Sequence, residues 1–378
     1  MSIRVPPNFP FFLLPVKSGS NNSLVIHSTM SYRTIYGSVN FPFASSSVSS
    51  GDSNVLLKDF IECSSNSTTI YNDLNRSYIY GSFSLLSNAI YYITPSNNLI
   101  NSTFSFTNNS INISSFSNIN EIYGAYIYLD TKNDSSNPVT LTSSFYLDNN
   151  SINISSYCNV YRIYAAYLDL VSNRDAVYHP NTISISSNSI SISSSISNCY
   201  QISFAQVSLS NCEVDNLLIN NNTLSFTNSD IDLSTTPVYL VNTDYSKDST
   251  IHNSIAENNS LNFINATNVS LGTLLGFDSF SFALPNNLPN NQTILYLRNQ
   301  SFPLIINAQK LSISNYDHFT SPLSINLIDA YGSGNISLSN TNGSYLYNTR
   351  TELKVIDNTL IFTFNPSISD SSPITLSI

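Results

Sequence analysis

One segment of the chain recurs with the order of its residues almost unchanged. The stretch NNSINISSFSNINEIYGAY runs from Asn108 to Tyr126, and NNSINISSYCNVYRIYAAY follows 41 residues later, from Asn149 to Tyr167. A third copy carries Ile190 and Ile192 at the isoleucine positions of the first two. Fainter copies follow at Leu224/Phe226 and Leu261/Phe263. A repeat of this length predicts a stack of similar units and not a single globular core.

A second motif, typified by IYGA, marks the same copies again. The spacing between its successive occurrences shrinks from 44 to 36 residues along the chain. The occurrences begin at Ile35, Ile79, Ile122, Ile163, Ile202, Val238 and Leu274. Two motif series that keep the same spacing along this part of the chain indicate that corresponding positions stack on one another.

Within each copy apolar and polar residues alternate strictly, as in Ser-Ile-Asn-Ile-Ser. This is the period of a half-buried strand, and good helix formers are scarce, so we predict an all-β fold. The long period and the ten glycines favour a parallel β-helix, or β-solenoid, over a sandwich of tight hairpins. We expect it to span residues 21–290, after a separate N-terminal segment at 1–20, with two coils of about 20 residues in each copy.

The alternation also predicts which side chains face the core. Six isoleucines are expected to point inward, namely Ile111, Ile113, Ile152, Ile154, Ile190 and Ile192. The residues between them, Asn112, Asn153 and Ser191, are expected to point outward. Asparagines at the corners are expected to adopt left-handed backbone conformations and to form hydrogen-bonded ladders between coils.

From about Asn291 the repeat fades and the expected strands lengthen. The segments 353–356 and 360–364, around Asp357, Asn358 and Thr359, are typical of a β-hairpin with a short turn. Because the last coil of a solenoid exposes an edge and an apolar end, we expect residues 291–378 to form a distinct capping unit.

These residues resemble the passenger domains of bacterial autotransporters. NNSINIS strands followed by IYGA or IYGS are similar to the repeats of that family, and SINLIDAYGSGNISL with TELKVIDNTLIFTF is similar to its closing unit. The resemblance covers about residues 21–366. It implies a right-handed β-helix with an autochaperone-like C-terminal unit and an adhesin-like role on the cell surface. The resemblance implies that a translocator barrel would begin after Ile378, and we expect none within residues 1–378.

Composition excludes several classes of function. Hydrophobic residues make up 41% and charged residues only 10%, which is unlike a disordered chain. The net charge of −10 and the absence of basic runs argue against nucleic acid as a partner. The N-terminal sequence MSIRVPPNFPFFLLPVKSGS is a poor match to a signal peptide, and no apolar run is long enough for a transmembrane helix.

The residues that bind metals or form disulfides are scattered. Cys63, Cys158, Cys199 and Cys212 are expected to be small buried residues, with a Cys199–Cys212 bridge as the alternative. The four histidines, at positions 27, 179, 252 and 318, stand singly. We therefore predict no metal site and no cofactor.

Two sequence features suggest hydrolytic chemistry. Ser50-Gly51-Asp52-Ser53 resembles a serine-hydrolase nucleophile, but no histidine or aspartate stands at a suitable spacing, and Asp317 directly adjoins His318. We interpret the motif as a polar turn.

Most enzymes that cleave glycosides use a pair of carboxyl groups as catalytic residues. Glu213/Asp215 and Asp230/Asp232 are each two residues apart, hence expected on one face of a strand, and they are the only candidate catalytic residues. Neither pair recurs in neighbouring copies, which favours solvated surface acids.

Tyrosines at related positions of successive copies are expected either to stack for stability or to form a stripe that binds sugars. They are Tyr123, Tyr126, Tyr128, Tyr164, Tyr167 and Tyr239.

Our first hypothesis is a non-catalytic, secreted or cell-surface solenoid that acts as an adhesin or stalk and contacts host matrix, glycans or other cells. A polysaccharide lyase or glycoside hydrolase on the same scaffold is the alternative, and a structural solenoid of a particle or coat is a third hypothesis.

Overall fold

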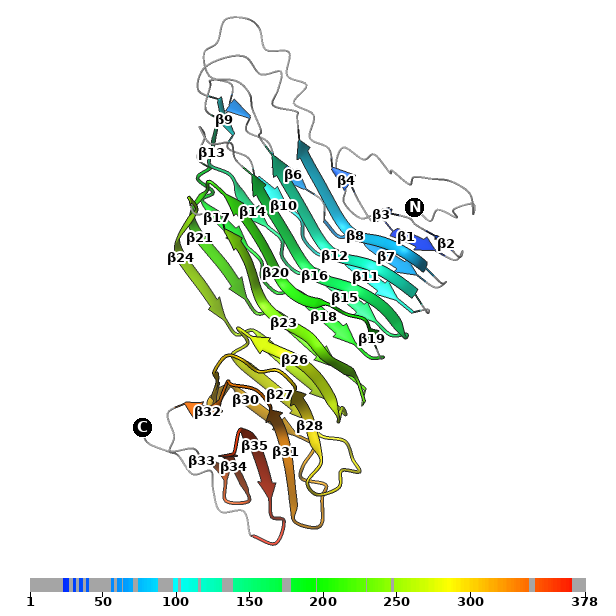
Figure 1. The fold of residues 1–378 in the computed structure, drawn as a ribbon, viewed down its shortest axis with the longest axis vertical. Helices are drawn as coiled ribbons and strands as arrows, with labels where there is room; N and C mark the ends of the chain where they lie inside the picture. Colours follow the sequence, from blue (N-terminus) through cyan, green and yellow to red (C-terminus); the bar gives the residue numbers. More distant parts are fainter. Residues whose placement is uncertain are drawn as a thin grey trace, which may run out of the picture.

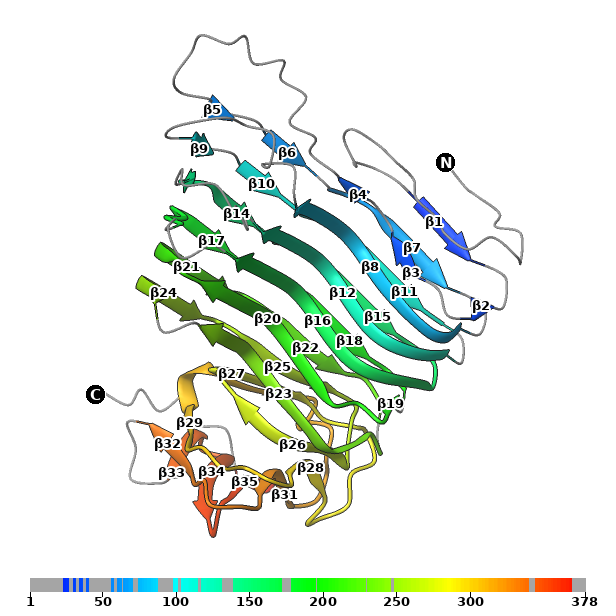
Figure 2. The same cartoon turned by 45° about the horizontal axis from the view of Figure 1, so that its top comes forward.

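The computed structural model describes most of the chain after residue 103 and short segments before it. The described residues are 23–26, 30–31, 34–36, 39–40, 56–57, 60–62, 64–70, 74–87, 98–100, 103–114, 117–130, 139–171, 178–194, 196–228, 230–245, 248–339 and 344–368. The fold is all-β, with a parallel β-solenoid over residues 103–330 and an antiparallel C-terminal section, as predicted. Figures 1 and 2 show the coils one above the other, with the C-terminal strands at one end of the stack.

The nine-stranded sheet forms one side of the solenoid, and all of its pairings are parallel. Its strands in spatial order are β1 (Ser23–Ile26), β7 (Ser67–Ile70), β11 (Ser110–Ile113), β15 (Ser151–Ile154), β18 (Ser189–Ile192), β22 (Thr223–Phe226), β25 (Ser260–Ile264), β27 (Ser279–Ala283) and β30 (Leu311–Ser314). Ile111 pairs with Ile152, and Ile152 pairs with Ile190, which confirms the predicted stacking.

The fifteen-stranded sheet forms the second side and runs into the C-terminal section. Its main path is β2 (Met30–Ser31), β8 (Leu74–Ser87), β12 (Ser117–Asp130), β16 (Cys158–Val171), β20 (Gln201–Ser210), β23 (Asp232–Tyr245), β26 (Val269–Leu275), β28 (Thr293–Leu297), β31 (Leu323–Ala330), β35 (Thr359–Phe364), β34 (Thr351–Ile356) and β33 (Ser344–Asn348). Off this path lie β3 (Thr34–Tyr36), β4 (Val39–Asn40) and β19 (Ile196–Ser197). All seven positions of the IYGA series lie on this sheet and pair in order, as expected.

Three smaller sheets complete the coils. The six-stranded sheet contains β6 (Phe60–Glu62), β10 (Thr103–Ser105), β14 (Ser144–Tyr146), β17 (Thr182–Ser184), β21 (Glu213–Asn220) and β24 (Thr250–Glu257). A three-stranded sheet contains β5 (Leu56–Leu57), β9 (Asn98–Ile100) and β13 (Val139–Leu141). A two-stranded sheet pairs β29 (Leu304–Asn307) with β32 (Ile336–Ser339), and a short 3-10 helix, η2 (Ala308–Lys310), follows β29.

The prediction of two coils in each copy is wrong, because one copy makes a single wide coil. From β11 the chain passes through β12, β13 and β14 before it reaches β15, and β11 pairs directly with β15. Strand alternation reveals which residues face inward, but it carries no information on how many strands close one turn.

The predicted core residues are confirmed. The six isoleucines are each at most 1% exposed, whereas the intervening Asn112, Asn153 and Ser191 are half-buried on the outer face. Phenylalanine rings also stack between coils, with Phe104 and Phe145 at a centroid distance of 4.8 Å. Apolar side chains of the same or similar kind therefore fill the same layer in most successive coils.

A buried column of asparagines runs along the inside of one corner. The inner asparagine column consists of Asn66, Asn109, Asn150, Asn188, Asn222 and Asn259, each at most 1% exposed. The Nδ2 of each of the first five donates to the Oδ1 of the next asparagine at 2.8–3.1 Å. The residues just before the column have left-handed backbone, with φ of 56–58°, at Ser65, Asn108, Asn149, Ser187, Asn221 and Asn258. The expectation of asparagine corners and ladders is thus confirmed.

Glycine in the IYGA step has a packing reason. A Cβ on Gly124 would lie 2.4 Å from the carbonyl oxygen of Ala165 and 3.2 Å from Cβ of Asn150. The neighbouring strand and the inner asparagine column both lie close to this step, which favours a small residue there.

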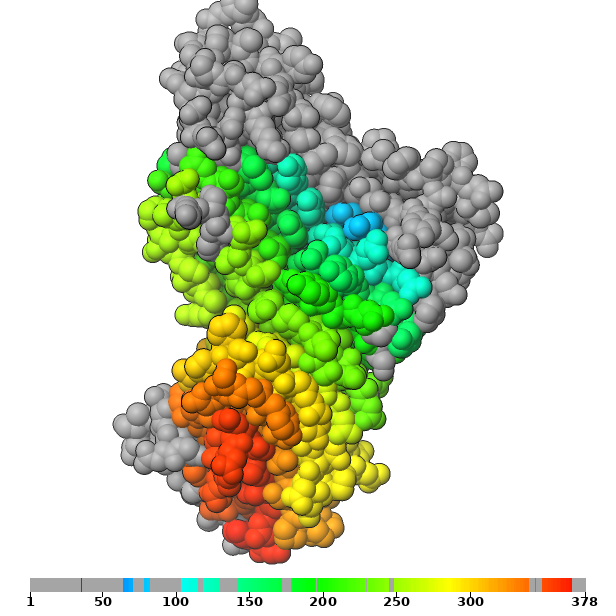
Figure 3. Space-filling model, viewed as in Figure 1, coloured from blue at the N-terminus to red at the C-terminus, as the bar shows by residue number. Residues whose placement is uncertain are grey.

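The solenoid narrows after β24. Leu261 of β25 pairs with Phe280 of β27, so this coil contains only 19 residues and lacks a strand of the six-stranded sheet. Parallel pairing continues past residue 290 through β30 and β32. The antiparallel strands β33, β34 and β35 then follow, and β35 pairs with β31. In the space-filling view this section, yellow to red, continues the body of the coils (Figure 3).

The predicted C-terminal hairpin is confirmed. β34 and β35 pair in register, with Ile356 opposite Thr359. Asp357 and Asn358 between them have φ of 45° and 61°, which is the backbone that a two-residue type I′ turn requires.

We expect Ile152→Asp to lower the free energy of unfolding by about 4 kcal/mol or more, because it removes a packed side chain and buries an unpaired charge. The matched control is Asn153→Asp, one position away on the outer face, for which we expect about 1 kcal/mol. Denaturant unfolding followed by far-UV circular dichroism measures both, and equal losses would reverse the assignment of faces.

We expect Asn150→Ala to cost about 3 kcal/mol, because two buried N–H groups of Asn109 donate to Oδ1 of Asn150 and would lose their acceptor. Asn153→Ala is the control. The Nδ2 of Asn153 donates a hydrogen bond to Oδ1 of Asn112 on the outer face at 2.9 Å, and we expect its loss to cost about 1 kcal/mol or less. Similar unfolding midpoints for the two variants would contradict a structural role for the inner column.

Candidate functional site

Tyrosines form two stacked rows on the outer face of the fifteen-stranded sheet. Tyr80, Tyr123 and Tyr164 stack with centroid distances of 4.7 and 5.2 Å. Tyr126 and Tyr167 stack alongside them at 4.9 Å. Tyr123 and Tyr164 are only 5% and 4% exposed, so the first row is packed into the wall. The interpretation of these positions as structural stacking fits this burial better than a sugar-binding stripe does.

The other two predicted tyrosines do not extend the rows. Tyr128 pairs with Asp169, and Tyr239 pairs with Ser203, which interrupts the first row after Tyr164.

A second, exposed tyrosine pair lies near the start of β16 and β20. The rings of Tyr161 and Tyr200 stack at 5.3 Å with 19° between their planes. Their exposed fractions are 47% and 56%. The guanidinium of Arg162 lies 4.9 Å from the ring of Tyr161 and 5.3 Å from that of Tyr200, and it donates to Glu121 at 2.9 Å. The cation therefore holds the pair in place by cation–π contact and a salt bridge.

Two cavities lie close to this pair and share Asn198, and Tyr161 lines one of them. One, of about 350 Å³, is lined by Asn118, Ile119, Asn120, Asn159, Val160, Tyr161 and Asn198. The other, of about 360 Å³, is lined by Tyr157, Ile196, Asn198, Cys199, Asp230, Asp232, Leu233, Ser234, Thr235 and Thr236. We call these two cavities, with Tyr200, the corner groove, because they lie where the nine-stranded sheet passes into the fifteen-stranded sheet.

The predicted catalytic acids lie on two different sheets. Glu213 and Asp215 are at the start of β21, in the six-stranded sheet, and Oε2 of Glu213 lies 3.3 Å from Nδ1 of His179. Asp232 begins β23 in the fifteen-stranded sheet and lines the corner groove with Asp230.

The expectation that Asp230 and Asp232 share one strand is wrong. Asp230 precedes β23 and has left-handed backbone, with φ of 60°, and it accepts a hydrogen bond from Asn268 at 2.8 Å. The turn before β23, and not the strand itself, therefore orients the side chain of Asp230.

The expectation that the cysteines are small buried residues is confirmed for the three that the structure describes, and the alternative, a Cys199–Cys212 bridge, is wrong. Cys158, Cys199 and Cys212 are buried and none is in a disulfide. Cys199 precedes β20 and Cys212 follows it, so the length of an extended strand, about 30 Å, separates them. Burial raises the pKa of both thiols to about 12.

The remaining candidate site residues either lie apart from one another or fall outside the described residues. Cys63, His27 and the Ser50–Ser53 motif lie outside the described residues. His252 is on β24, and His318 contacts the carbonyl of Asn286. Within the described part of the chain, no three His, Cys, Asp or Glu side chains form a group that would hold a metal ion.

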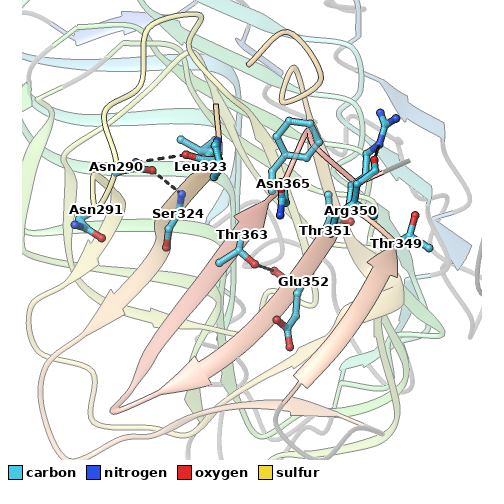
Figure 4. A pocket seen from close by; sticks show the side chains of 13 residues that line it. Asn290, Asn291, Leu323, Ser324, Thr349, Arg350, Thr351, Glu352, Thr363 and Asn365 are labelled. Carbon is cyan, nitrogen blue, oxygen red and sulfur yellow. Dashed lines mark hydrogen bonds between the residues drawn. The ribbon is translucent and has the colours of Figure 1, made fainter. Parts of the chain in front are cut away.

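A further cavity, of about 550 Å³, lies in the C-terminal section (Figure 4). Asn290 and Ser324 form one side of it, and Arg350 and Thr351 form the other. Its charged groups already have partners in the chain. Arg350 donates to the carbonyl of Ile368 at 2.7 Å, and Glu352 accepts from Ser344 and Lys354. We therefore interpret this cavity as part of the packing of the C-terminal strands.

The corner groove was missed in the sequence because its tyrosines do not recur in every copy. The signal was nonetheless present, since Tyr161 and Tyr200 are 39 residues apart, the same step that separates the paired Ile163 and Ile202.

Comparisons with known proteins identify no relative. No family profile, curated protein or solved structure matches the chain. In the described segments, no helix has the length and apolar character that a membrane crossing needs.

The stacked tyrosines predict a loss of stability in alkali. Burial is the main cause that raises the pKa of Tyr164 above the usual value near 10, and it raises the pKa of Tyr167 to about 12. The folded chain favours the neutral phenols, so their contribution to the free energy of unfolding is fully present below about pH 10. It is lost as the pH rises from about 10 toward 12, by about 1 kcal/mol per pH unit for each tyrosine.

We expect Tyr164→Phe/Tyr167→Phe to lessen this dependence. Urea unfolding between pH 9 and 11.5 measures it, with phenolate absorbance near 295 nm as the second signal. An identical pH slope in the variant would contradict the prediction.

Proposed function

We propose that the chain is a non-catalytic β-solenoid that acts outside the cell as an adhesin or surface stalk. It contacts host matrix, glycans or other cells through the outer face of the fifteen-stranded sheet. The observation that carries this proposal is the exposed aromatic pair and adjoining corner groove on a rigid, continuously paired wall.

The scaffold suits such a role because each coil is fixed by the coils on both sides. Amide columns, stacked rings and strand pairing all run along the long axis, so a surface feature is held in place by several coils. The resemblance of the repeats and the closing unit to autotransporter passengers supports the surface location.

The alternative function, a lyase or hydrolase, is favoured by one observation. Asp230 and Asp232 line a cavity beside an exposed aromatic residue, Tyr157. Against it, the residues that line this cavity include no Lys, Arg or His to bind a sugar acid or to complete acid–base chemistry.

The test is to immobilise the purified chain and to measure retention of cells, matrix preparations and a panel of polysaccharides, while soluble reducing ends are assayed in parallel. We expect retention without cleavage. Cleavage that is lost in Asp230→Asn/Asp232→Asn or Glu213→Gln/Asp215→Asn, in chains that keep their unfolding midpoint, would replace the adhesin proposal with the enzyme. Absence of both retention and cleavage would overturn the proposal.

A further inference from the structure

We infer that the corner groove binds an uncharged oligosaccharide, with a sugar ring lying on the Tyr161/Tyr200 pair. This inference rests on the proposed surface-binding function and names the ligand class and the place. We therefore expect binding at one place on the fifteen-stranded sheet, because the exposed pair spans two neighbouring coils and does not continue along the whole wall.

The tyrosine pair is arranged for contact and not for packing. The structural row of Tyr80, Tyr123 and Tyr164 continues over three coils, and Tyr123 and Tyr164 are buried, whereas Tyr161 and Tyr200 are about half exposed. The pair spans two coils, and Tyr161 lines a cavity together with Asn120 and Asn198. Exposed aromatic faces are suited to the apolar C–H face of a sugar ring, and Arg162 restricts their motion before binding.

Amide groups beside the rings match the hydroxyls of a sugar. Nδ2 of Asn159 donates to Oδ1 of Asn118 at 2.8 Å, and Nδ2 of Asn198 donates to Oδ1 of Asn159 at 3.0 Å. Asn198 ends this column with left-handed backbone, φ 54°, and lines both cavities. Its amide retains a donor proton and an acceptor oxygen beyond its single described hydrogen bond, and a sugar hydroxyl uses both kinds of partner.

The charges select against an acidic sugar. The lining of the two cavities contains no basic residue, and it contains the carboxylates Asp230 and Asp232. Arg162, the nearest cation, is already paired with Glu121. Uronic or sulfated sugars would meet like charge, whereas the hydroxyls of a neutral sugar can donate to the carboxylates.

The experiment uses saturation-transfer difference NMR on the full chain with three hexasaccharides: a neutral β-linked glucan, an N-acetylglucosamine oligomer and an oligogalacturonate. We expect transfer to a neutral oligomer and none to the oligogalacturonate. Tyr161→Ala/Tyr200→Ala should weaken binding of the neutral oligomer by about tenfold or more. Asn198→Ala should weaken it by a smaller factor.

The matched control is Tyr331→Ala. Tyr331 is 47% exposed and lies 5.3 Å from the guanidinium of Arg298, but it is in the C-terminal section and away from the groove. This variant should bind as the unaltered chain does. Circular dichroism and the unfolding midpoint establish that each variant is folded.

Three outcomes would overturn the inference: binding of the acidic oligomer in preference, no binding of either neutral oligomer, or neutral binding that the tyrosine and Asn198 substitutions leave unchanged. If the immobilised chain still retains cells or matrix in any of these cases, only the groove inference fails. If it retains nothing, the proposed function fails with it.

Discussion

The structure depends on the requirement that every buried polar group at the coil corner finds a partner in the next coil. The inner asparagine column meets this requirement because an amide both donates and accepts, so one residue type can be repeated without limit along the axis. Asn150 also donates to the carbonyl of Phe106, which satisfies a backbone group of the coil before it. A shift of one coil by one residue would break its bonds in the column, so the column favours a single register between successive coils from Asn66 to Asn259.

This constraint explains which parts of the fold were predictable. The alternation around Ile111 and Ile152 determined the buried face, and the equal spacing of the two motif series determined which residues pair. The number of strands in a turn depended instead on segments without periodic pattern, such as those that carry β13 and β14, and local alternation cannot reveal it. The separation of Cys199 from Cys212 followed only once β20 was known to be one extended strand.

The candidate site was less predictable than the core for a related reason. Core positions must repeat, because each stacks on its equivalent, and repetition is visible in a sequence. Tyr161 and Tyr200 stand on the outer face and are about half exposed, so the residue at such a position can change with little loss of packing. A departure from the repeat on an exposed face is therefore more informative about binding than the repeat itself, and the regularly spaced Tyr123 and Tyr164 proved to be buried.

The column also has to end, and its end differs chemically from its interior. An asparagine after Asn259 would add a further amide N–H₂, which would need an acceptor in the coil that follows. Asp278 stands at this place, and its carboxylate accepts from the backbone N–H groups of Asn258 and Asn259 at 3.1 and 2.7 Å while it donates nothing. Lys310, the last residue of η2, forms an ion pair with the half-buried Asp278 and so balances its negative charge. The solenoid narrows to its 19-residue coil at this same point, between Leu261 and Phe280. The loss of one side of the coil and the change from amide to carboxylate thus occur together, since a shorter turn has no corner in which another asparagine would be enclosed.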